Sequence, residues 1–464
     1  MFAPRVSSFV RRPRRAAQLA LAAGVVVLAA GASEAASADA YRRALERALA
    51  PPAVLRGGTV FGAPLVTADN AVEALYPRTP QVIDALCQGI DEAEHEVLLQ
   101  TYEYDDHDEA AERVLAALCR RLRRALARPD ASGPPFVVRL LTSGSWPREN
   151  GLSQAQLRAT IAEWAADERA PGRIAVDWAT YRGSPLAILH SKTVVFDRRR
   201  ALVMTGNLYT HGGLAQDSVN MAALLQGPMA LGLRADWLDA RAQGSLEAAA
   251  GGPSFDGVNG AALPAGPEGK AGEAVAAILS RPSHWSFWQT GEDNPQAQGL
   301  LALIDTASVS IDLLNPSLSV PRLQQALVRA IIERGVRVRA LLSLEMNRTR
   351  ERRFFGGDGL QQAAKMRRAL WAAGGRQAAR RLDIRFASDD GVTPSPAASP
   401  GNVHAKVASF DETCLLIGST NWNWLSWNNG RELSVASISP EQASAFSRDL
   451  FAPLLERGVP APAY

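Results

Sequence analysis

The chain has 464 residues, of which 47% are hydrophobic and 21% are charged, and its formal net charge is +3 at pH 7. This length is enough for two or three domains, and the composition is that of a globular protein rather than of a disordered or fibrous chain. A net charge this small favours anionic partners weakly and does not single out nucleic acid. No spacing of cysteines and histidines resembles a zinc site, so we expect no bound metal.

The chain begins with the three parts of an export signal, which we place at residues 1–38. A positively charged stretch at residues 11–15 (RRPRR) precedes an apolar stretch at residues 19–30, which is too short to span a bilayer comfortably. An A-x-A cleavage motif follows at residues 36–38, so we expect cleavage near Ala38 and a mature protein that is secreted or periplasmic. An uncleaved membrane anchor is the alternative.

The next part of the chain alternates strands with helices. After an N-terminal extension at residues 39–80, we expect a first lobe at residues 81–245 with a helix at residues 108–126. The expected strands are apolar or β-branched runs bounded by turn residues, at residues 96–104, 136–144, 174–181, 191–196, 201–206 and 219–226. Cys87 and Cys119 fall on helical stretches beside one strand, but sequence does not show whether they form a disulfide.

A linker and a second lobe follow. The linker is expected at residues 246–290, because residues 251–272 are rich in glycine and proline. The second lobe, at residues 291–464, has a predicted helix at residues 320–335 that ends in a glycine. Its expected strands lie at residues 309–315, 336–344, 382–388, 403–410, 414–420 and 432–438.

Two copies of the spacing His-x-Lys-x4-Asp indicate an internal repeat. The copies begin at His190 and His404, an offset of 214 residues (404 − 190), and the same offset carries Asn207 onto Asn421. A repeat of this length, with strands and helices in the same order, predicts an α/β protein made of two lobes of one fold. We expect each lobe to contain a mixed sheet, because the later strands follow one another without helices.

Each copy of the motif puts polar side chains on apolar strands. Because side chains alternate along a strand, the histidine and lysine share a face, as do the hydroxyl and the amide on the next strand. The ammonium supplies a point charge, and the hydroxyl and amide supply donors, a set that suits a phosphate group. The candidates are His190, Lys192, Thr205 and Asn207 in the first lobe and His404, Lys406, Ser419 and Asn421 in the second.

The second copy, HAKVASFDETCLLIGSTN from His404 to Asn421, resembles the signature of the phospholipase D superfamily. The resemblance covers the chain from about Ile83 to Ile438. It implies a duplicated α/β/α layered fold with the active site at the lobe interface, and a metal-independent phosphodiester chemistry that needs no cofactor. The first copy departs from the signature, because Met204 and Thr205 replace a glycine and a serine.

The resemblance also implies covalent catalysis by the two imidazoles. His190 would attack phosphorus and His404 would protonate the leaving alcohol, and water or a second alcohol would then open the phosphohistidine. The motif lysines and asparagines would stabilise charge on the phosphate oxygens. Asp197 and Asp411 complete the catalytic motif, although an aspartate at the start of a tight turn more often has a positioning role.

An acidic side chain that orients an imidazole is expected after the second motif. Glu432 follows Asn421 as the supporting acid of the resembled family does, and we count it with the catalytic residues. Its counterpart in the first lobe stays open, because the offset of 214 leads to Ser218, with Asp217 and Asn220 nearby. If none of these residues supports an imidazole, the first-lobe motif is catalytically weaker or the protein is a degenerate member of the resembled family.

The predicted substrate is a glycerophospholipid whose distal phosphodiester is hydrolysed, with transfer to a second alcohol as a variant. Trp422, Trp424 and Trp427, with the aromatic residues at 284–289, suit either a lipid headgroup region or internal packing. The expected partners are therefore a phospholipid and a membrane surface. A metal-independent nuclease and a catalytically weak module that binds anionic lipid are the alternatives. The arginine-rich residues 347–353 fit solvated helix faces as well as an anionic partner.

Overall fold

The computed structural model describes residues 34–50, 65–75, 79–129, 133–144, 153–181, 187–208, 218–250, 274–283, 294–344, 358–396, 399 and 401–462. Several predictions concern residues outside these ranges. They are the leader up to residue 33, the linker at residues 251–272, the aromatic residues at 284–289 and the arginines at 347–353. Within these ranges, no helix is both long and apolar enough to cross a membrane.

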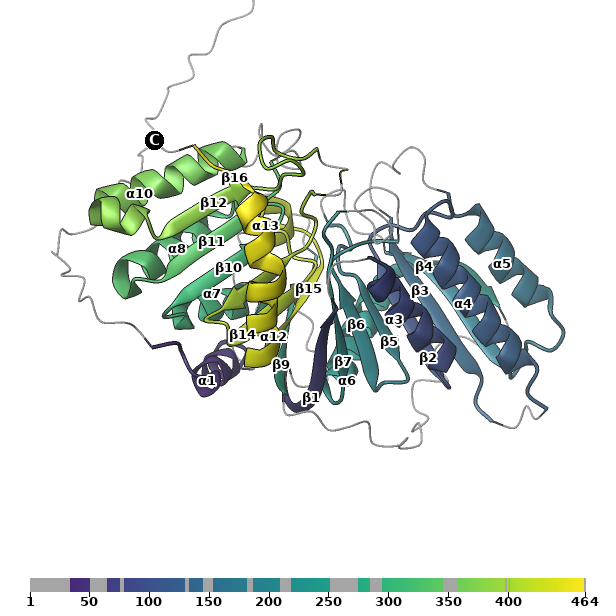
Figure 1. Cartoon of the computed structure of the whole chain (residues 1–464). Coiled ribbons are helices and arrows are strands. Elements are labelled where there is room, and N and C mark those ends of the chain that lie inside the picture. Colours follow the sequence, from purple (N-terminus) through teal and green to yellow (C-terminus); the bar gives the residue numbers. More distant parts are fainter. Residues whose placement is uncertain are drawn as a thin grey trace, which may run out of the picture. The chain divides into compact units, whose positions relative to one another are not determined.

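The described strands form one mixed sheet of sixteen strands, and its two halves repeat the same strand order (Figure 1). The first half runs β1 (Val66–Leu75), β7 (Ala222–Gln226), β6 (Arg200–Met204), β5 (Thr193–Phe196), β2 (Glu96–Thr101), β3 (Phe136–Ser143), β4 (Ile174–Tyr181) and β8 (Gly244–Ala250). The second half runs β9 (Ala274–Arg281), β15 (Glu432–Ile438), β14 (Cys414–Gly418), β13 (Val407–Phe410), β10 (Ser310–Leu314), β11 (Arg337–Leu342), β12 (Leu382–Phe386) and β16 (Val459–Pro460). The halves meet where β1 pairs with β9, so the predicted duplication and mixed sheets are confirmed.

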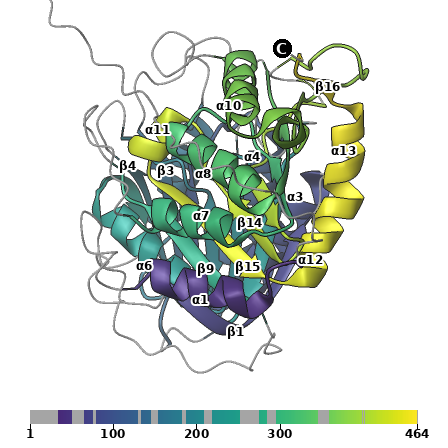
Figure 2. The same cartoon turned by 90° about the vertical axis from the view of Figure 1, so that its left-hand side faces the viewer.

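Helices cover both faces of this sheet. One face carries α3 (Thr79–Glu92), α4 (Glu109–Leu126) and α5 (Ala155–Ala166) in the first lobe. In the second lobe it carries α7 (Pro295–Thr306), α8 (Pro321–Arg334) and α10 (Gly359–Ala379), which lie at the front of Figure 2. The other face carries α6 (Met229–Ala242) in the first lobe, and α12 (Pro440–Ala445), a π-helical turn (Phe446–Phe451) and α13 (Ala452–Arg457) in the second. The apolar cluster on that second face contains residues of both lobes, which makes it a shared core.

The structure changes the predicted lobe boundaries. β1 was predicted to belong to an N-terminal extension and β9 to the linker, but each is the strand through which its lobe joins the other. β8 likewise carries the first lobe past residue 245. These strands lack the usual pattern of β-branched and apolar residues: β9 is rich in alanine, and β1 contains Asp69 and Asn70 at a break in its register.

The predicted helix-ending glycine is present, and the disulfide that the sequence left open is not formed. Gly335 follows α8 in a left-handed conformation with φ of 69°, which a residue without a Cβ adopts at little cost. Cys87 on α3 and Cys119 on α4 are both free thiols.

The motif aspartates lie in tight turns and bind backbone rather than the site. Asp411, with φ of 53°, opens the turn between β13 and β14, and its carboxylate accepts the backbone N–H groups of Ser308, Val309 and Ser310 at 2.8–3.2 Å. Asp197 opens the equivalent turn between β5 and β6 and accepts the N–H groups of residues 94–96, each at 2.8 Å. Both carboxylates therefore fasten a hairpin to the start of a neighbouring strand, at the opposite end of the hairpin from the histidines. These contacts fit the positioning role, and a part for the two aspartates in the chemistry stays a prediction.

The segment before α1 (Ala38–Ala48) is part of the folded structure. Ser37 caps the helix by accepting the N–H of Ala40 at 3.2 Å, and the N–H of Ala36 donates to Asp411 at 3.1 Å. The carbonyl of Glu34 accepts the hydroxyl of Ser308 at 2.8 Å. Cleavage after Ala38 would remove all of these contacts and place a free ammonium in the first turn of α1, where the helix dipole disfavours positive charge.

We therefore expect a chain that begins at Asp39 to be less stable than one that begins at Glu34. The lost cap and the new charge together predict a difference in unfolding free energy of about 1–3 kcal/mol. Urea unfolding of the two chains measures this difference, and Ser37→Ala in the longer chain isolates the cap. Equal unfolding midpoints would show that residues 34–37 contribute nothing to the fold.

Candidate active site

The two motif histidines lie where each lobe pairs briefly with the other. The backbone N–H of His190 donates to the carbonyl of Arg431 at 2.8 Å, and Leu189 forms an isolated bridge with the same residue. In the matching place, the N–H of His404 donates to the carbonyl of Val219 at 3.2 Å. Regular pairing within β5 and β13 begins only after the motif lysines. His404 was predicted inside a strand at residues 403–410 and His190 directly before one at residues 191–196, whereas the structure places both histidines on segments that pair with the other lobe.

His190 is oriented by a carboxylate from the second lobe. Its Nδ1 lies 2.9 Å from both carboxylate oxygens of Glu432, the first residue of β15. Ser419 donates its hydroxyl to the same carboxylate. The edge of the Tyr102 ring faces the imidazole with ring centroids 5.4 Å apart. Because Nδ1 carries the proton that Glu432 accepts, Nε2 keeps its lone pair for a reaction.

His404 is oriented by a carboxamide from the first lobe. Its Nδ1 lies 3.0 Å from Oδ1 of Asn220, which also accepts the hydroxyl of Thr205 at 3.1 Å. Nδ2 of Asn220 lies 3.3 Å from Oγ of Ser218 and fixes which way the amide points. His404 therefore has the same kind of support as His190, but the supporting group is neutral.

Asn220 and Glu432 occupy equivalent places in the two lobes. Thr205 exchanges two hydrogen bonds with Met221, at 2.8 and 2.9 Å, and Ser419 exchanges the same two with Leu433, at 2.9 and 3.0 Å. The offset between the lobes is thus 212 residues here (432 − 220) instead of 214, because the loop after the motif is two residues longer in the first lobe. This shift explains why the sequence offset led to Ser218 and left the first-lobe counterpart undecided.

The motif lysines are buried beside the histidines. Nζ of Lys192 donates to the carbonyl of His190 and lies 5.6 Å from the centre of the Tyr102 ring. Nζ of Lys406 donates to the carbonyl of His404 and, at 3.4 Å, to the carbonyl of Thr205 in the other lobe. Each ammonium thus bonds to the backbone next to its own imidazole.

Burial dominates the electrostatics of the site. Burial lowers the pKa of His190 to about 4 although Glu432 opposes it, and burial lowers the pKa of Lys192 to about 7. The pKa of His404 lies well below its usual value because of burial, with Lys406, Lys192 and His190 adding to the effect and no carboxylate opposing it. Burial, with Lys192 adding, also lowers the pKa of Lys406. His404 bonds to Asn220 and Lys406 bonds to the carbonyl of Thr205, so the second motif lies against residues that follow the first motif. The two lysines bring positive charge to this junction, which suits an anionic ligand.

The remaining predicted site residues divide into two groups. The hydroxyls of Thr205 and Ser419, predicted to bind substrate, are fully buried and already bonded to Asn220 and Glu432, so they position those residues instead. The Oδ1 atoms of Asn207 and Asn421 are buried and have no hydrogen-bond partner. The role of these two amides in binding substrate stays a prediction, because an amide oxygen accepts hydrogen bonds and does not donate one to a phosphate.

The tryptophans after the second motif pack inside the protein. Trp422 and Trp427 are almost fully buried and belong to the apolar cluster of the second lobe, and Trp427 lies on α11 (Trp424–Asn428). Trp424 is half-buried. The packing interpretation holds for the first two, and the lipid-facing one is wrong for them.

Sequence reasoning missed two groups that hold the site together, because neither Tyr102 nor Arg431 was singled out. Asn220 was named only as one of several candidates for the first-lobe counterpart of Glu432. Arg431 is fully buried and pairs with Asp236 at 2.8 Å and Asp239 at 2.7 Å on α6, which ties the residue before Glu432 to the first lobe. The one available signal was that Arg431 directly precedes the predicted supporting acid.

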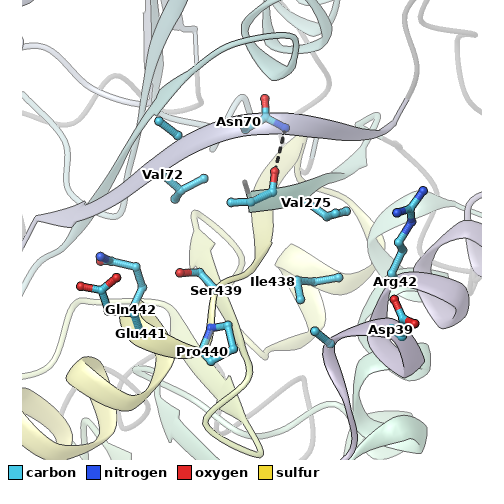
Figure 3. A pocket seen from close by; sticks show the side chains of 13 residues that line it. Asp39, Arg42, Asn70, Val72, Val275, Ile438, Ser439, Pro440, Glu441 and Gln442 are labelled. Carbon is cyan, nitrogen blue, oxygen red and sulfur yellow. Dashed lines mark hydrogen bonds between the residues drawn. The ribbon is translucent and has the colours of Figure 1, made fainter. Parts of the chain in front are cut away.

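A hollow of about 510 Å³ lies elsewhere, between α1, β1, β9 and the start of α12 (Figure 3). Arg42, Glu441 and Gln442 are among its lining residues, and Asn70 at its rim donates to the carbonyl of Ala274 at 3.5 Å. None of the motif residues lines it. In the described ranges, no group of three or more His, Cys, Asp or Glu residues is arranged to hold a metal ion.

Comparisons with known proteins agree with the fold. The model of the family described as "Cardiolipin synthase, PLD-like domain" matches residues 300–452. The crystal structure of phosphatidylserine synthase from Haemophilus influenzae Rd KW20 is similar with a TM-score of 0.58 and 13% identity, over 90% of this chain and 91% of that chain. No curated protein matches the chain.

Two smaller solved structures also match. They are the phospholipase D family member Nuc from Salmonella typhimurium, with 14% identity and a TM-score of 0.27, and NucT from Helicobacter pylori, with 16% identity and a TM-score of 0.29. They cover 39% and 40% of this chain and 99% of their own length.

The match to the family model places residues 300–452 among phospholipase D-like domains, and the repeated strand order gives the first lobe the same fold. The chain therefore has a duplicated phospholipase D-like fold, with its two His-x-Lys motifs at the junction between the lobes.

Proposed function

We propose that this protein cleaves a lipid phosphodiester through a phosphohistidine intermediate on His190. The observation that carries the proposal is the contact between Nδ1 of His190 and Glu432 of the opposite lobe, within a site that also contains His404 and both motif lysines. A carboxylate on Nδ1 makes Nε2 more nucleophilic and stabilises the positive ring that forms when Nε2 bonds to phosphorus. His404 has no such carboxylate, so it fits the proton-transfer role better than the nucleophilic one.

The chemistry proceeds in two steps in this proposal. Nε2 of His190 forms a bond to phosphorus while the bond to the leaving oxygen breaks and His404 gives that oxygen a proton, and Lys192 and Lys406 stabilise charge on the phosphate oxygens. Water or an alcohol then loses its proton to Nε2 of His404 and attacks phosphorus, which releases His190. Water gives hydrolysis and an alcohol gives transfer.

A glycerophospholipid is the substrate we propose. The matched family model is named for cardiolipin synthase, and the similar full-length structure is a phosphatidylserine synthase, so both names concern lipid phosphodiesters. The leader-like N-terminus supports a place outside the cytoplasm, where a membrane surface would be the partner. Hydrolysis of the distal phosphodiester and transfer of the phosphatidyl group are two outcomes of the same intermediate.

Mass spectrometry of lipid mixtures incubated with the protein tests this function. We expect phosphatidic acid with water alone, or a new phosphatidyl ester when glycerol or phosphatidylglycerol is added. Glu432→Gln keeps the shape but removes the charge, and should lose most of the activity. His107→Ala replaces an exposed histidine outside the site and should retain it. Cutting of plasmid DNA in EDTA without lipid turnover would indicate a nuclease, and vesicle binding without turnover a binding module.

The pH dependence of kcat/KM should reflect two of the groups whose pKa values are shifted in the free protein, His190 and Lys192. His190 must be neutral to attack, so activity should fall only as the pH decreases toward about 4. Lys192 must be charged to bind phosphate, so activity should also fall as the pH rises through about 7. A profile measured in buffers of constant ionic strength checks both limbs. A flat profile up to pH 9 would contradict the role of Lys192.

A further inference from the structure

An exposed tryptophan lies among cations on α10. Trp371 is 58% exposed, and it is the one aromatic residue among the large apolar residues that are exposed in the described ranges. Lys365 and Arg368 precede it at steps of three residues, which places the three side chains along one side of the helix. All three are exposed, as are Ala372 and Arg376. We call these five residues the α10 surface.

The cations of the α10 surface have no carboxylate partner. α10 contains no aspartate or glutamate in its 21 residues, and its three exposed cations form no ion pair within the described part of the chain. On α4, by contrast, the exposed Arg120 and Arg124 both pair with Asp91 at 2.7 Å. Unpaired cations on one face give a positive potential, which an anionic surface can meet without first breaking an ion pair.

α10 lies at the same end of the sheet as the motif histidines. The turn at Asp411 accepts the hydroxyl of Tyr41 on α1 at 3.0 Å, and His404 lies at the other end of that hairpin. In both views, α1 is at the lower end of the molecule and α10 is at the upper end (Figure 1, Figure 2). A partner bound by α10 is therefore held at the end of the sheet where the proposed reaction takes place.

We propose that the α10 surface docks the protein on an anionic lipid bilayer. The inference rests on the proposed function, because it assigns the face that meets the proposed membrane partner. An indole at the level of the lipid headgroups buries its ring and keeps its N–H hydrated, and cations beside it attract anionic headgroups. The tryptophan favours a bilayer over duplex nucleic acid, whose phosphate backbone offers an indole no apolar layer to enter.

Vesicle sedimentation tests the docking surface directly. The chain that begins at Glu34 is used, because residues from 33 onward form one compact unit and the leader has cations and apolar residues of its own. It should bind mixed vesicles of phosphatidylcholine and phosphatidylglycerol much more tightly than vesicles of phosphatidylcholine alone. Each cation near an anionic surface contributes about 5-fold to binding, so a triple variant with Lys365→Gln, Arg368→Gln and Arg376→Gln should bind about 100-fold more weakly. Adding His190→Ala to every protein in this assay keeps the lipids intact.

Two controls separate docking from a general effect of charge. The changes Arg120→Gln, Arg123→Gln and Arg124→Gln together alter the net charge by the same amount on α4, and they should leave vesicle binding within a few-fold. Trp371→Ala should weaken binding by about 10-fold, because an apolar ring is no longer buried. Trp371→Tyr keeps an amphipathic ring and should restore most of the binding.

Activity on two forms of a phospholipid keeps this inference distinct from the proposed function. The triple variant should lose kcat/KM on mixed vesicles in proportion to its binding, and keep it on a short-chain phospholipid dispersed as monomers. Turnover of the monomeric lipid by a wild type that does not prefer anionic vesicles would overturn the docking surface alone. So would unchanged vesicle binding in the triple variant, or binding to duplex DNA instead of vesicles. Vesicle binding without turnover of either form would instead remove the proposed function.

Discussion

Replacing His404 with alanine is expected to give a burst of phenol from an aryl phosphodiester, whereas replacing His190 should give none. In His404→Ala, the nucleophile and its carboxylate remain, so the first step proceeds and about one equivalent of phenol per site is released. The second step lacks its base, so steady-state turnover should fall by about 10²–10⁴-fold. In His190→Ala no intermediate forms, and the loss should be on the order of 10⁶-fold, as for other catalytic nucleophiles.

Rapid-mixing measurements of phenol release and mass spectrometry of the quenched protein check this expectation. The His404→Ala protein should carry the phosphoryl adduct on the peptide that contains His190, and the adduct should be lost in acid. His107→Ala serves as the control for loss of an imidazole outside the site. A burst in His190→Ala with none in His404→Ala would reverse the two roles.

The difference between the two histidines also shows where sequence reasoning stopped. The motif spacing predicted His190, Lys192, His404 and Lys406 because these residues are close in sequence and repeat with a fixed offset. The supporting residues come from the opposite lobe, and the loop before them differs in length by two residues. A fixed sequence offset cannot reveal an insertion that lies between two contacts present in both lobes. Asn220 was therefore one of several candidates until the hydrogen bonds of Met221 and Leu433 fixed the register between the lobes.

The fold was predictable where local patterns are strong. Apolar and β-branched runs gave the central strands of each half, and β4 and β15 have the predicted bounds. β1 and β9 were missed because their partner strands stabilise them more than their own composition does. An alanine-rich or polar segment becomes a strand when both of its edges are paired, and that pairing depends on the other lobe. The strands at the junction between the lobes, where the site lies, are therefore the ones that local sequence patterns predict least well.

Asp411→Ala is expected to destabilise the protein strongly while leaving the chemistry of the remaining folded molecules nearly intact. The carboxylate accepts backbone N–H groups from Ala36, Ser308, Val309 and Ser310, and it also accepts the hydroxyl of Tyr41 at 3.0 Å. Its removal leaves several buried donors without an acceptor. Each such donor costs about 1–3 kcal/mol, and partial access of water to the gap limits the total, so we expect a loss of about 3–5 kcal/mol in unfolding free energy.

The equivalent aspartate of the first lobe provides the matched comparison. Within the described ranges, Asp197 accepts the three N–H groups of residues 94–96 and is half-buried, so Asp197→Ala should cost less, about 1–2 kcal/mol. Asp411→Asn retains one acceptor oxygen and should fall between wild type and Asp411→Ala. Urea unfolding followed by tryptophan fluorescence gives the order, and kcat/KM per folded molecule should stay within a few-fold of wild type. An unchanged unfolding midpoint with a large loss of kcat in Asp411→Ala would mean that the carboxylate acts in the chemistry after all, since a group that only fastens backbone cannot alter the reaction without first weakening the fold.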